Sequence, residues 1–264
     1  SADGTAAVRC GEHGDGAGGG PFSGRLTAPL CVAGGIALQA LEARGIKIAA
    51  HIAQLGTEPI TDEALNPMEL DEAQLDAIAA NPLPCIDASA ARRMHEAILR
   101  AKSELDSLGA VIECVAYNVP AGLGDPMFDG MESRIARIAF GIPGVKGVEF
   151  GEGFGATLMR GSEHNDPFYM QDGHPHMATN HAGGILGGIT CGTPLIWRMA
   201  VKPTPSIGKP QRSVDLDAHR DTELTVRGRH DPCIAPRAVP VAEAACACAI
   251  LDAMLTSAGT QRIL

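Results

Sequence analysis

The chain has 264 residues, of which 45% are hydrophobic and 20% charged, and its formal net charge is −10. This length is enough to bury a sizeable core, in one large domain or two small ones. Aromatic residues make up only 3%, with a single tryptophan, so few side chains could stack on unpaired bases. The negative charge also opposes binding along a phosphate backbone. We therefore expect no nucleic-acid partner.

The eight cysteines include no C-x-x-C pair, the spacing typical of zinc and thioredoxin-like sites. We interpret them as reduced thiols and expect no metal site. We find no apolar run long enough to span a bilayer and no signal-peptide pattern. The sequence thus favours a cytoplasmic protein with no membrane partner.

The N-terminal third mixes helical and extended patterns. Residues 1–20 are rich in glycine and poor in apolar residues, so we expect a loop there. Apolar residues recur at helical spacing from Leu30 to Leu41, with Gly45 as the stop, and residues 46–52 alternate like a strand. Residues 57–84 are acidic, and we interpret them as a surface insertion or flank with a short helix over 69–80.

The remaining two thirds continue to alternate between helix and strand. The clearest helix spans residues 88–109, and residues 151–177 read as a long irregular loop. Further elements are predicted in chain order: a strand over 111–119, a helix over 131–140, strands over 147–150, 195–201 and 223–226, and a helix over 241–255. No repeat or linker divides the chain, so we expect a single domain over 1–264.

The stretch from Asn180 to Gln211 carries the strongest signal for a ligand. It opens with glycine pairs, which let backbone approach a ligand closely, and continues with Lys202, Thr204, Ser206 and Lys209 on proline-stiffened backbone. Between residues 198 and 237 eight basic residues outnumber five acidic ones. These donors favour a pocket for a phosphorylated cofactor. The alternatives are glycines that permit tight packing and a solvated charged face.

Three further patterns bear on ligand or metal binding. Arg229, His230 and Asp231 follow a glycine and could hold an anion and assist proton transfer, or could form a surface turn. Residues 151–156 fit G-x-G-x-x-A, but no helix is predicted to follow, which disfavours a dinucleotide fold. The histidines at 174, 176 and 181 lack an acidic or sulfur ligand at a diagnostic spacing.

Several long segments, in order, resemble the signature segments of chorismate synthase. They are FSGRLTAP (22–29), IPGVKGVEFGEGF (142–154), RGSEHNDPF (160–168), NHAGGILGGIT (180–190), KPTPSIGKPQR (202–212) and GRHDPCIAPRAVPVAEA (228–244). The resemblance implies an α+β fold, a β-α-β sandwich-like core of antiparallel sheet and helices. It implies a lyase of the shikimate pathway, in aromatic amino acid biosynthesis. The family's reaction is a 1,4-elimination of phosphate from 5-enolpyruvylshikimate 3-phosphate that gives chorismate.

The resemblance also implies reduced FMN, which transiently donates an electron to expel phosphate before a ring proton is lost. Asp231 resembles the carboxylate that assists proton removal. The positions similar to flavin contacts are Phe22, Ser23, Pro143, Gly144, Gly187, Lys202, Pro203, Thr204, Pro205, Ser206 and Arg229. NADPH, a cytoplasmic location and a homotetramer are further expectations from the family.

Near the N-terminus the chain departs from the family pattern. A G-E-S-H-G segment with a catalytic histidine is absent, and Ser1 stands where a second catalytic histidine is expected before Ala2 and Asp3. The sequence therefore predicts the C-terminal portion of the enzyme, with little or no turnover by itself. The alternatives are a non-catalytic paralogue that binds FMN or another phosphoanion, and one half of a split enzyme.

Overall fold

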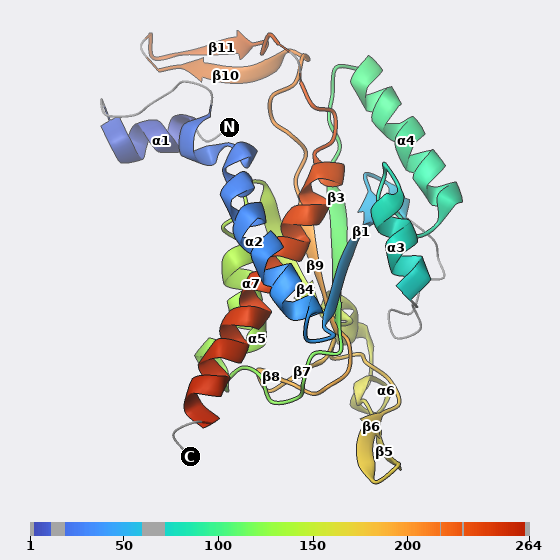
Figure 1. Cartoon of the computed structure of the whole chain (residues 1–264). Coiled ribbons are helices and arrows are strands. Elements are labelled where there is room, and N and C mark those ends of the chain that lie inside the picture. Colours follow the sequence, from blue (N-terminus) through green and yellow to red (C-terminus); the bar gives the residue numbers. More distant parts are fainter. Residues whose placement is uncertain (1–2, 12–18, 60–71, 217, 229, 262–264) are drawn as a thin grey trace.

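The computed structural model describes residues 3–11, 19–59, 72–216, 218–228 and 230–261. Its centre is a five-stranded sheet in the order β2-β1-β3-β9-β4, in which every neighbouring pair is antiparallel (Figure 1). The strands are β1 (Lys47–Leu55), β2 (Glu58–Pro59), β3 (Ala110–Tyr117), β4 (Val145–Phe150) and β9 (Leu195–Val201). β3 and β9 are rich in β-branched and apolar residues, which pack well on a pleated surface.

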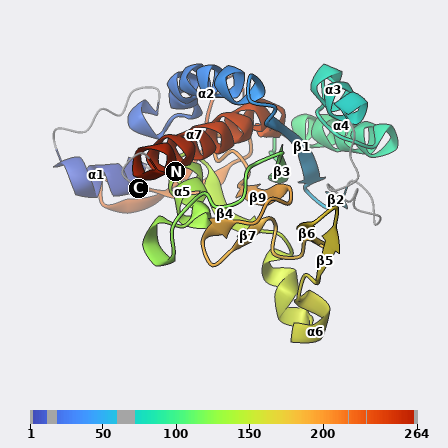
Figure 2. The same ribbon diagram turned by 60° about the horizontal axis from the view of Figure 1, so that its bottom comes forward.

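Three helices cover one face of this sheet: α2 (Thr27–Glu42), α5 (Met131–Ala139) and α7 (Ala235–Gln261). α7 lies against β1 and β3, α2 packs along α7, and α5 contacts α7 and β4 (Figure 2). The core lies between α7 and the sheet, where Trp197 of β9 is fully buried. The thiol of Cys114 on β3 lies beside Cys246 of α7, and burial raises the pKa of Cys114 well above its usual value.

The contact between α2 and α7 depends on small side chains. A Cβ atom at Gly34 would overlap the Cα and Cβ atoms of Ala244, so the two backbones meet with no room for a side chain on α2. Charged residues are absent from Leu26 to Leu41, and the side of α2 away from α7 exposes Val32 and Ile36. α2 is therefore apolar around most of its circumference.

A row of four ionisable side chains, here called the charge row, crosses the sheet at one level: His51, Glu113, Arg198 and Glu149 are successive register partners. His51 Nε2 lies 3.0 Å from Glu113 Oε1, and Arg198 Nε donates to Glu113 Oε2 at 2.7 Å. His51 and Glu113 are both 6% exposed. Burial alone would raise the pKa of Glu113, but hydrogen bonds and charges from His51 and Arg198 hold it below its usual value.

The remaining elements surround this core. The helices are α1 (Asp3–Cys10), α3 (Glu72–Ala80), α4 (Ala88–Ser103) and α6 (Gly161–His164). Short 3₁₀ helices span Gly20–Phe22, Gly24–Leu26, Met127–Asp129 and Gly153–Leu158. Three hairpins are β5 (Phe168–Gln171) with β6 (His174–Met177), β7 (Ile185–Leu186) with β8 (Ile189–Thr190), and β10 (Gln211–Asp215) with β11 (Arg220–Leu224). β10–β11 and β5–β6 project at opposite ends of the molecule (Figure 1).

The α+β class and the main helices and strands predicted from the sequence are confirmed. Five predictions were wrong in part. The strand predicted over 223–226 is β11, which spans Arg220–Leu224. Residues 3–10 form a helix, and α4 ends at Ser103 because Leu105 adopts a left-handed backbone with φ 58°. Residues 151–177 contain helical turns and a hairpin. α7 begins six residues before the predicted start and contains Pro240. Residues 60–71 of the predicted insertion lie outside the described residues.

The expectation that no apolar run is long enough to span a bilayer was also wrong, because two helices have the length and the composition that a membrane span requires. Gly24–Glu42 and Ala235–Ser257 both pass that test, with mean hydropathies of 1.2 and 1.7. The second segment is 61% buried within the fold. Core helices of water-soluble proteins meet the same criterion, so the finding is weak evidence for a membrane.

The α2–α7 contact gives a first prediction. Gly34→Val should lower the free energy of unfolding by about 1–3 kcal/mol, because the added side chain must separate the helices. The control is Gly35→Ala, one residue along the same helix, where an added Cβ meets nothing within 4 Å. That change should raise stability by about 0.5–1 kcal/mol. Urea unfolding of both variants measures the difference, and equal stabilities would contradict the close contact.

The charge row gives a second prediction. The pKa of Glu113 is lower in the folded state, so this carboxylate stabilises the fold above its unfolded pKa of about 4.3. That contribution is lost as the pH falls through the lower folded value. Glu113→Gln should lower the free energy of unfolding by about 3 kcal/mol near neutral pH. It should also make that free energy fall less steeply as the pH is lowered. Glu96→Gln, at an exposed position, is the control. The free energy of unfolding of both variants is measured between pH 3 and 7. If Glu113→Gln left its dependence on pH unchanged, the role of Glu113 would be refuted.

Candidate functional site

The segment from Lys202 to Ser206 leaves the end of β9 and lies beside the start of β4. The backbone N–H of Lys202 donates to the carbonyl of Gly144 at 2.9 Å. Gly144 has φ 98°, a backbone conformation that favours glycine, and a Cβ there would lie 3.7 Å from Ile234 Cδ1. The structure thus brings together two of the segments predicted to contact flavin, Pro143–Gly144 and Lys202–Ser206.

The turn between α4 and β3 fixes this loop from a second side. Ser107 Oγ donates to the carbonyl of Thr204 at 2.6 Å, and the carbonyl of Leu105 accepts from the N–H of Gly208 at 3.1 Å. Lys209 Nζ donates to Asp106 Oδ2 at 2.7 Å, and this bond, with one from the Ser107 N–H, lowers the pKa of Asp106. Lys209 was predicted as a donor to an anion, but the structure pairs it with this turn.

Asp231 reaches the same end of the sheet. The carbonyl of Pro232 accepts from the N–H of Leu108 at 2.8 Å, which ties the segment before α7 to the start of β3. The Asp231 carboxylate forms an ion pair with Arg237 and accepts from the N–H of Cys233 at 3.3 Å. Its side chain is 28% exposed, so solvent reaches it. Arg229, another predicted contact, lies outside the described residues.

The Lys202 loop keeps donors that the described residues do not use. Thr204 Oγ1 is buried and has no hydrogen-bond partner among the described residues. Lys202 Nζ has only a long contact of 3.5 Å with the carbonyl of Pro203, and Ser206 is exposed. A buried hydroxyl without a partner costs free energy, which a bound oxygen atom would recover. These residues therefore fit the phosphate or another polar group of a flavin cofactor.

Three predicted contact residues, in two segments, lie apart from this cluster. Gly187 forms the turn of β7–β8, which neighbours the N-terminus of α5 because Met131 N–H donates to the carbonyl of Gly188. The β7–β8 hairpin lies at the end of the sheet opposite to β10, which follows the Lys202 loop (Figure 1). Phe22 and Ser23 lie just before α2, and no hydrogen bond among the described residues joins them to the Lys202 loop.

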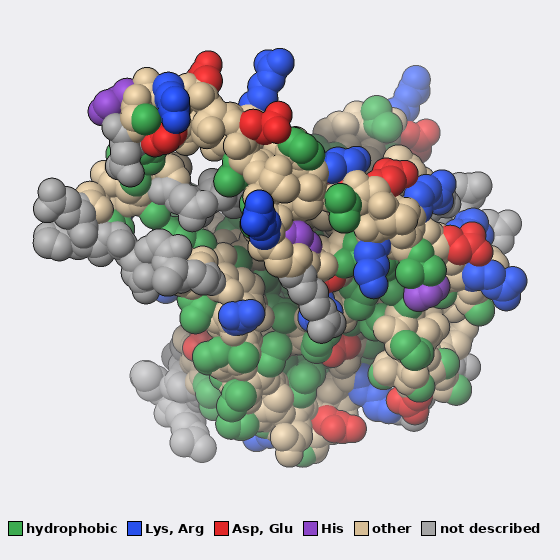
Figure 3. Space-filling view, turned by 90° about the horizontal axis from the view of Figure 1, so that it is seen from above, with side chains coloured by type: hydrophobic (Ala, Val, Ile, Leu, Met, Phe, Trp, Pro, Cys, Tyr) green, Lys and Arg blue, Asp and Glu red, His purple; other side chains and the backbone are tan. Residues whose placement is uncertain are grey.

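Figure 3 looks down on the end of the molecule that carries β10–β11 and α4. Lysine and arginine side chains are spread over this face together with acidic ones, so it is not one continuous basic surface. The excess of basic residues between 198 and 237 is therefore partly a solvated charged face. The unused donors of the Lys202 loop carry the argument for a site better than this charge balance does.

One carboxylate that the sequence analysis missed organises the Asn180 segment. The Asp166 side chain is 2% exposed and accepts from Thr179 Oγ1 at 2.6 Å and from the backbone N–H groups of His181 and Ala182 at 2.8 and 3.0 Å. Burial would raise its pKa, but these bonds and His181 hold the pKa below its usual value. Asp166 lies inside a family-like segment, RGSEHNDPF, which was the one signal that could have found it. Nothing in the sequence marked Ser107.

Comparisons with known proteins agree with this reading. The family model described as chorismate synthase matches residues 1–255. A chorismate synthase from Korarchaeum cryptofilum is 47% identical over 256 residues, which cover 97% of this chain and 69% of that protein. A chorismate synthase from Dehalococcoides mccartyi is 45% identical, and the match covers 100% of this chain and 71% of that protein. A chorismate synthase from Thermococcus gammatolerans is 46% identical, and the match covers 96% of this chain and 69% of that protein.

The fold has a solved counterpart. A crystal structure of a chorismate synthase superposes with a TM-score of 0.74 at 28% sequence identity. The match covers 89% of this chain and 64% of the crystallised chain, so this chain spans slightly less than two thirds of that protein's length. These matches do not support the predictions that the chain is only a C-terminal portion and that its turnover is reduced. Family model and relatives together show that the chain belongs to the chorismate synthase family, a family of lyases.

Proposed function

We propose that this protein catalyses the 1,4-elimination of phosphate from 5-enolpyruvylshikimate 3-phosphate to give chorismate, with FMN in its reduced form. A C–O bond to phosphate breaks and a ring proton is lost, so the substrate undergoes no net oxidation. The reduced flavin, when bound, supplies electron density that favours departure of the phosphate. The observation that carries the proposal is the Lys202 loop, whose buried Thr204 hydroxyl and Lys202 ammonium remain available to a ligand.

In this proposal the loop binds and orients the cofactor. Lys202, Thr204 and Ser206 donate to its polar groups, while Pro203 and Pro205 limit the backbone freedom that binding would otherwise remove. Gly144 lets the backbone pass close to the ring or phosphate without a side chain. Motif similarity extends the same role to Phe22, Ser23, Pro143, Gly187 and Arg229.

Asp231 is the group that we assign to proton removal. Its ion pair with Arg237 keeps a positive charge beside the carboxylate, and its partial exposure leaves it accessible to a ligand. A carboxylate that accepts a proton in the transition state typically contributes 10²–10⁴-fold to the rate. We further propose a cytoplasmic homotetramer that uses NADPH, as expected for the family. Because Gly187 and the Lys202 loop lie at opposite ends of the sheet, we also propose a site built from more than one segment or copy.

Titration with FMN, oxidised and reduced, with and without 5-enolpyruvylshikimate 3-phosphate, tests the proposal together with an anaerobic assay of chorismate formation. Binding of reduced FMN with turnover supports it. Binding without turnover would favour a phosphoanion-binding protein and overturn the catalytic assignment. Absence of both binding and turnover would overturn the whole proposal.

Substitution of Asp231 tests its role in proton transfer. Asp231→Asn should lower kcat by about 10²–10⁴-fold while the dissociation constant for FMN changes little, because the amide keeps the shape of the side chain. Asp172→Asn is the control, in the turn between β5 and β6, where φ is 51° and asparagine is well tolerated. Stopped-flow assays across a range of pH measure both variants. Equal rates for the two would refute the assignment.

Removal of the Thr204 hydroxyl should affect FMN binding without lowering the stability of the fold. Thr204→Val should leave the free energy of unfolding unchanged or slightly higher, because the hydroxyl has no partner in the described structure, and should weaken FMN binding about tenfold. Thr190→Val is the matched control. That hydroxyl donates to the carbonyl of Pro120 at 2.7 Å and accepts from the N–H of Leu123 at 2.9 Å, so its loss should cost about 1–3 kcal/mol. Unchanged FMN affinity in Thr204→Val would count against the flavin site.

A further inference from the structure

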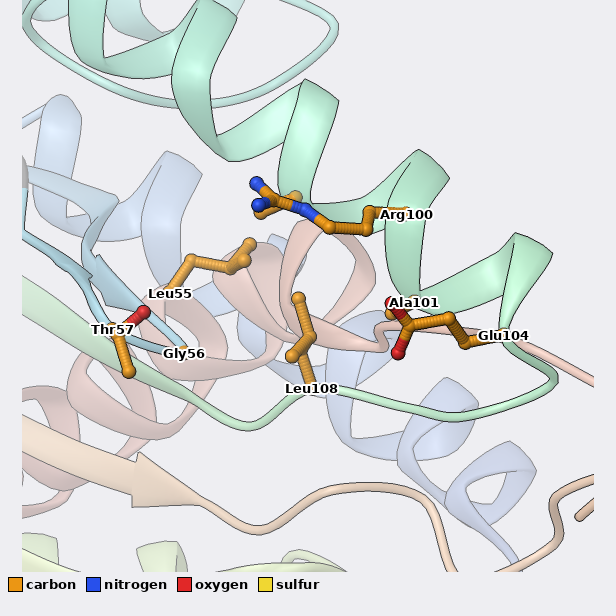
Figure 4. A pocket seen from close by; sticks show the side chains of 8 residues that line it. Leu55, Gly56, Thr57, Arg100, Ala101, Glu104 and Leu108 are labelled. Atoms are coloured by element: carbon orange, nitrogen blue, oxygen red, sulfur yellow. The ribbon is translucent and has the colours of Figure 1, made fainter.

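A small cavity lies between the C-terminal half of α4, the end of β1 and the segment before β3 (Figure 4). Its volume is about 210 Å³, below the range of about 300–1,000 Å³ that holds drug-sized ligands. A ligand here would have to be a small metabolite. The residues that matter for the argument are Leu55, Ala97, Arg100, Ala101, Glu104 and Leu108.

The cavity has an apolar floor with opposite charges on its rim. Leu108 is partly buried and Leu55 fully buried, so Leu55 forms the base of the hollow. Figure 4 shows the Arg100 side chain extending toward Leu55 and the Glu104 side chain toward Leu108. The described residues give the Arg100 guanidinium no ion pair, and Glu104 has only a 3.9 Å contact with Lys209. A second hollow of about 250 Å³ on the other side of Gly56 has no charged side chain in its lining. Of these two hollows in the described part of the chain, the first combines apolar walls with both charges.

We propose that this cavity binds a zwitterionic ligand with an apolar side chain, that is, a small α-amino acid. Its carboxylate would meet Arg100, whose planar fork suits a carboxylate, and its ammonium would meet Glu104. Its side chain would pack against the partly buried Ala97 and Leu108, because Leu55 beneath them is already fully buried. A ligand of about nine heavy atoms in a shallow site binds weakly, with a dissociation constant of roughly 1 mM.

The cavity is physically connected to the Lys202 loop. Glu104 and Leu108 begin and end the turn whose opposite side makes the bonds from Ser107 to Thr204 and from Lys209 to Asp106. An ammonium group beside Glu104 would compete with Lys209 for that carboxylate. Ligand binding should therefore change the affinity of the loop for its own ligand, and by thermodynamic linkage the reverse holds. This coupling rests on the proposed function, whereas the amino-acid site does not.

Calorimetric titration with L-leucine tests the site itself. Saturable binding is expected, with at least tenfold weaker binding of 4-methylpentanoate, which lacks the ammonium, and of 3-methylbutylamine, which lacks the carboxylate. Arg100→Gln and Glu104→Gln should each weaken leucine binding at least fivefold. Arg92→Gln, on the same helix but outside the cavity lining, is the control and should bind as the unaltered protein does. Absence of saturable binding, or equal binding by Arg100→Gln and the control, would overturn the site.

FMN titration with and without saturating leucine tests the coupling. A shift of at least twofold in the dissociation constant for FMN, absent in Arg100→Gln, supports it. Leucine binding with no such shift would overturn the coupling. Leucine binding by a protein that binds no FMN would overturn the proposed function while leaving the amino-acid site established.

Discussion

The antiparallel register of β9 with β3 and β4 is the constraint on which the candidate site depends. Val201 is the register partner of both Ala110 and Val145, so the end of one strand meets the beginnings of two others. Three loops far apart in sequence must therefore emerge at one edge of the sheet. The hydrogen bonds from Lys202 to Gly144 and from Ser107 to Thr204 are local consequences of that register. A slip by one residue would also turn the buried Trp197 toward the opposite face.

The sequence predicted regular elements well where one pattern dominated. The helix over 131–140 and the strand over 195–201 had clear periodicity and appear as α5 and β9. The C-terminal limit of α4 was missed because Leu105 and Leu108 continue the apolar pattern beyond the helix, while tertiary bonds hold the turn in a left-handed conformation. The hairpin β5–β6 was missed because its exposed polar and aromatic residues show no core-facing alternation.

The candidate site was predictable as a set of segments rather than as a geometry. Motif similarity singled out Gly144, Lys202–Ser206 and Asp231, and the structure brings these to one end of the sheet. The same motifs included Gly187, which the fold places at the other end of β9. Sequence reasoning also gave Lys209 to the ligand, because a charge near other donors looks available until its partner is known. Asp106 is that partner, and it lies 103 residues earlier in the chain.

The position of Trp197 has a practical consequence for optical work on this protein. It is the only tryptophan in the chain, and it is fully buried on β9 next to Cys114, under α7. Its emission spectrum therefore reports hydration of the interface between sheet and helices and comes from no other part of the molecule. A red shift in that emission would register separation of α7 from the sheet, while motions of the projecting hairpins would leave the spectrum unchanged.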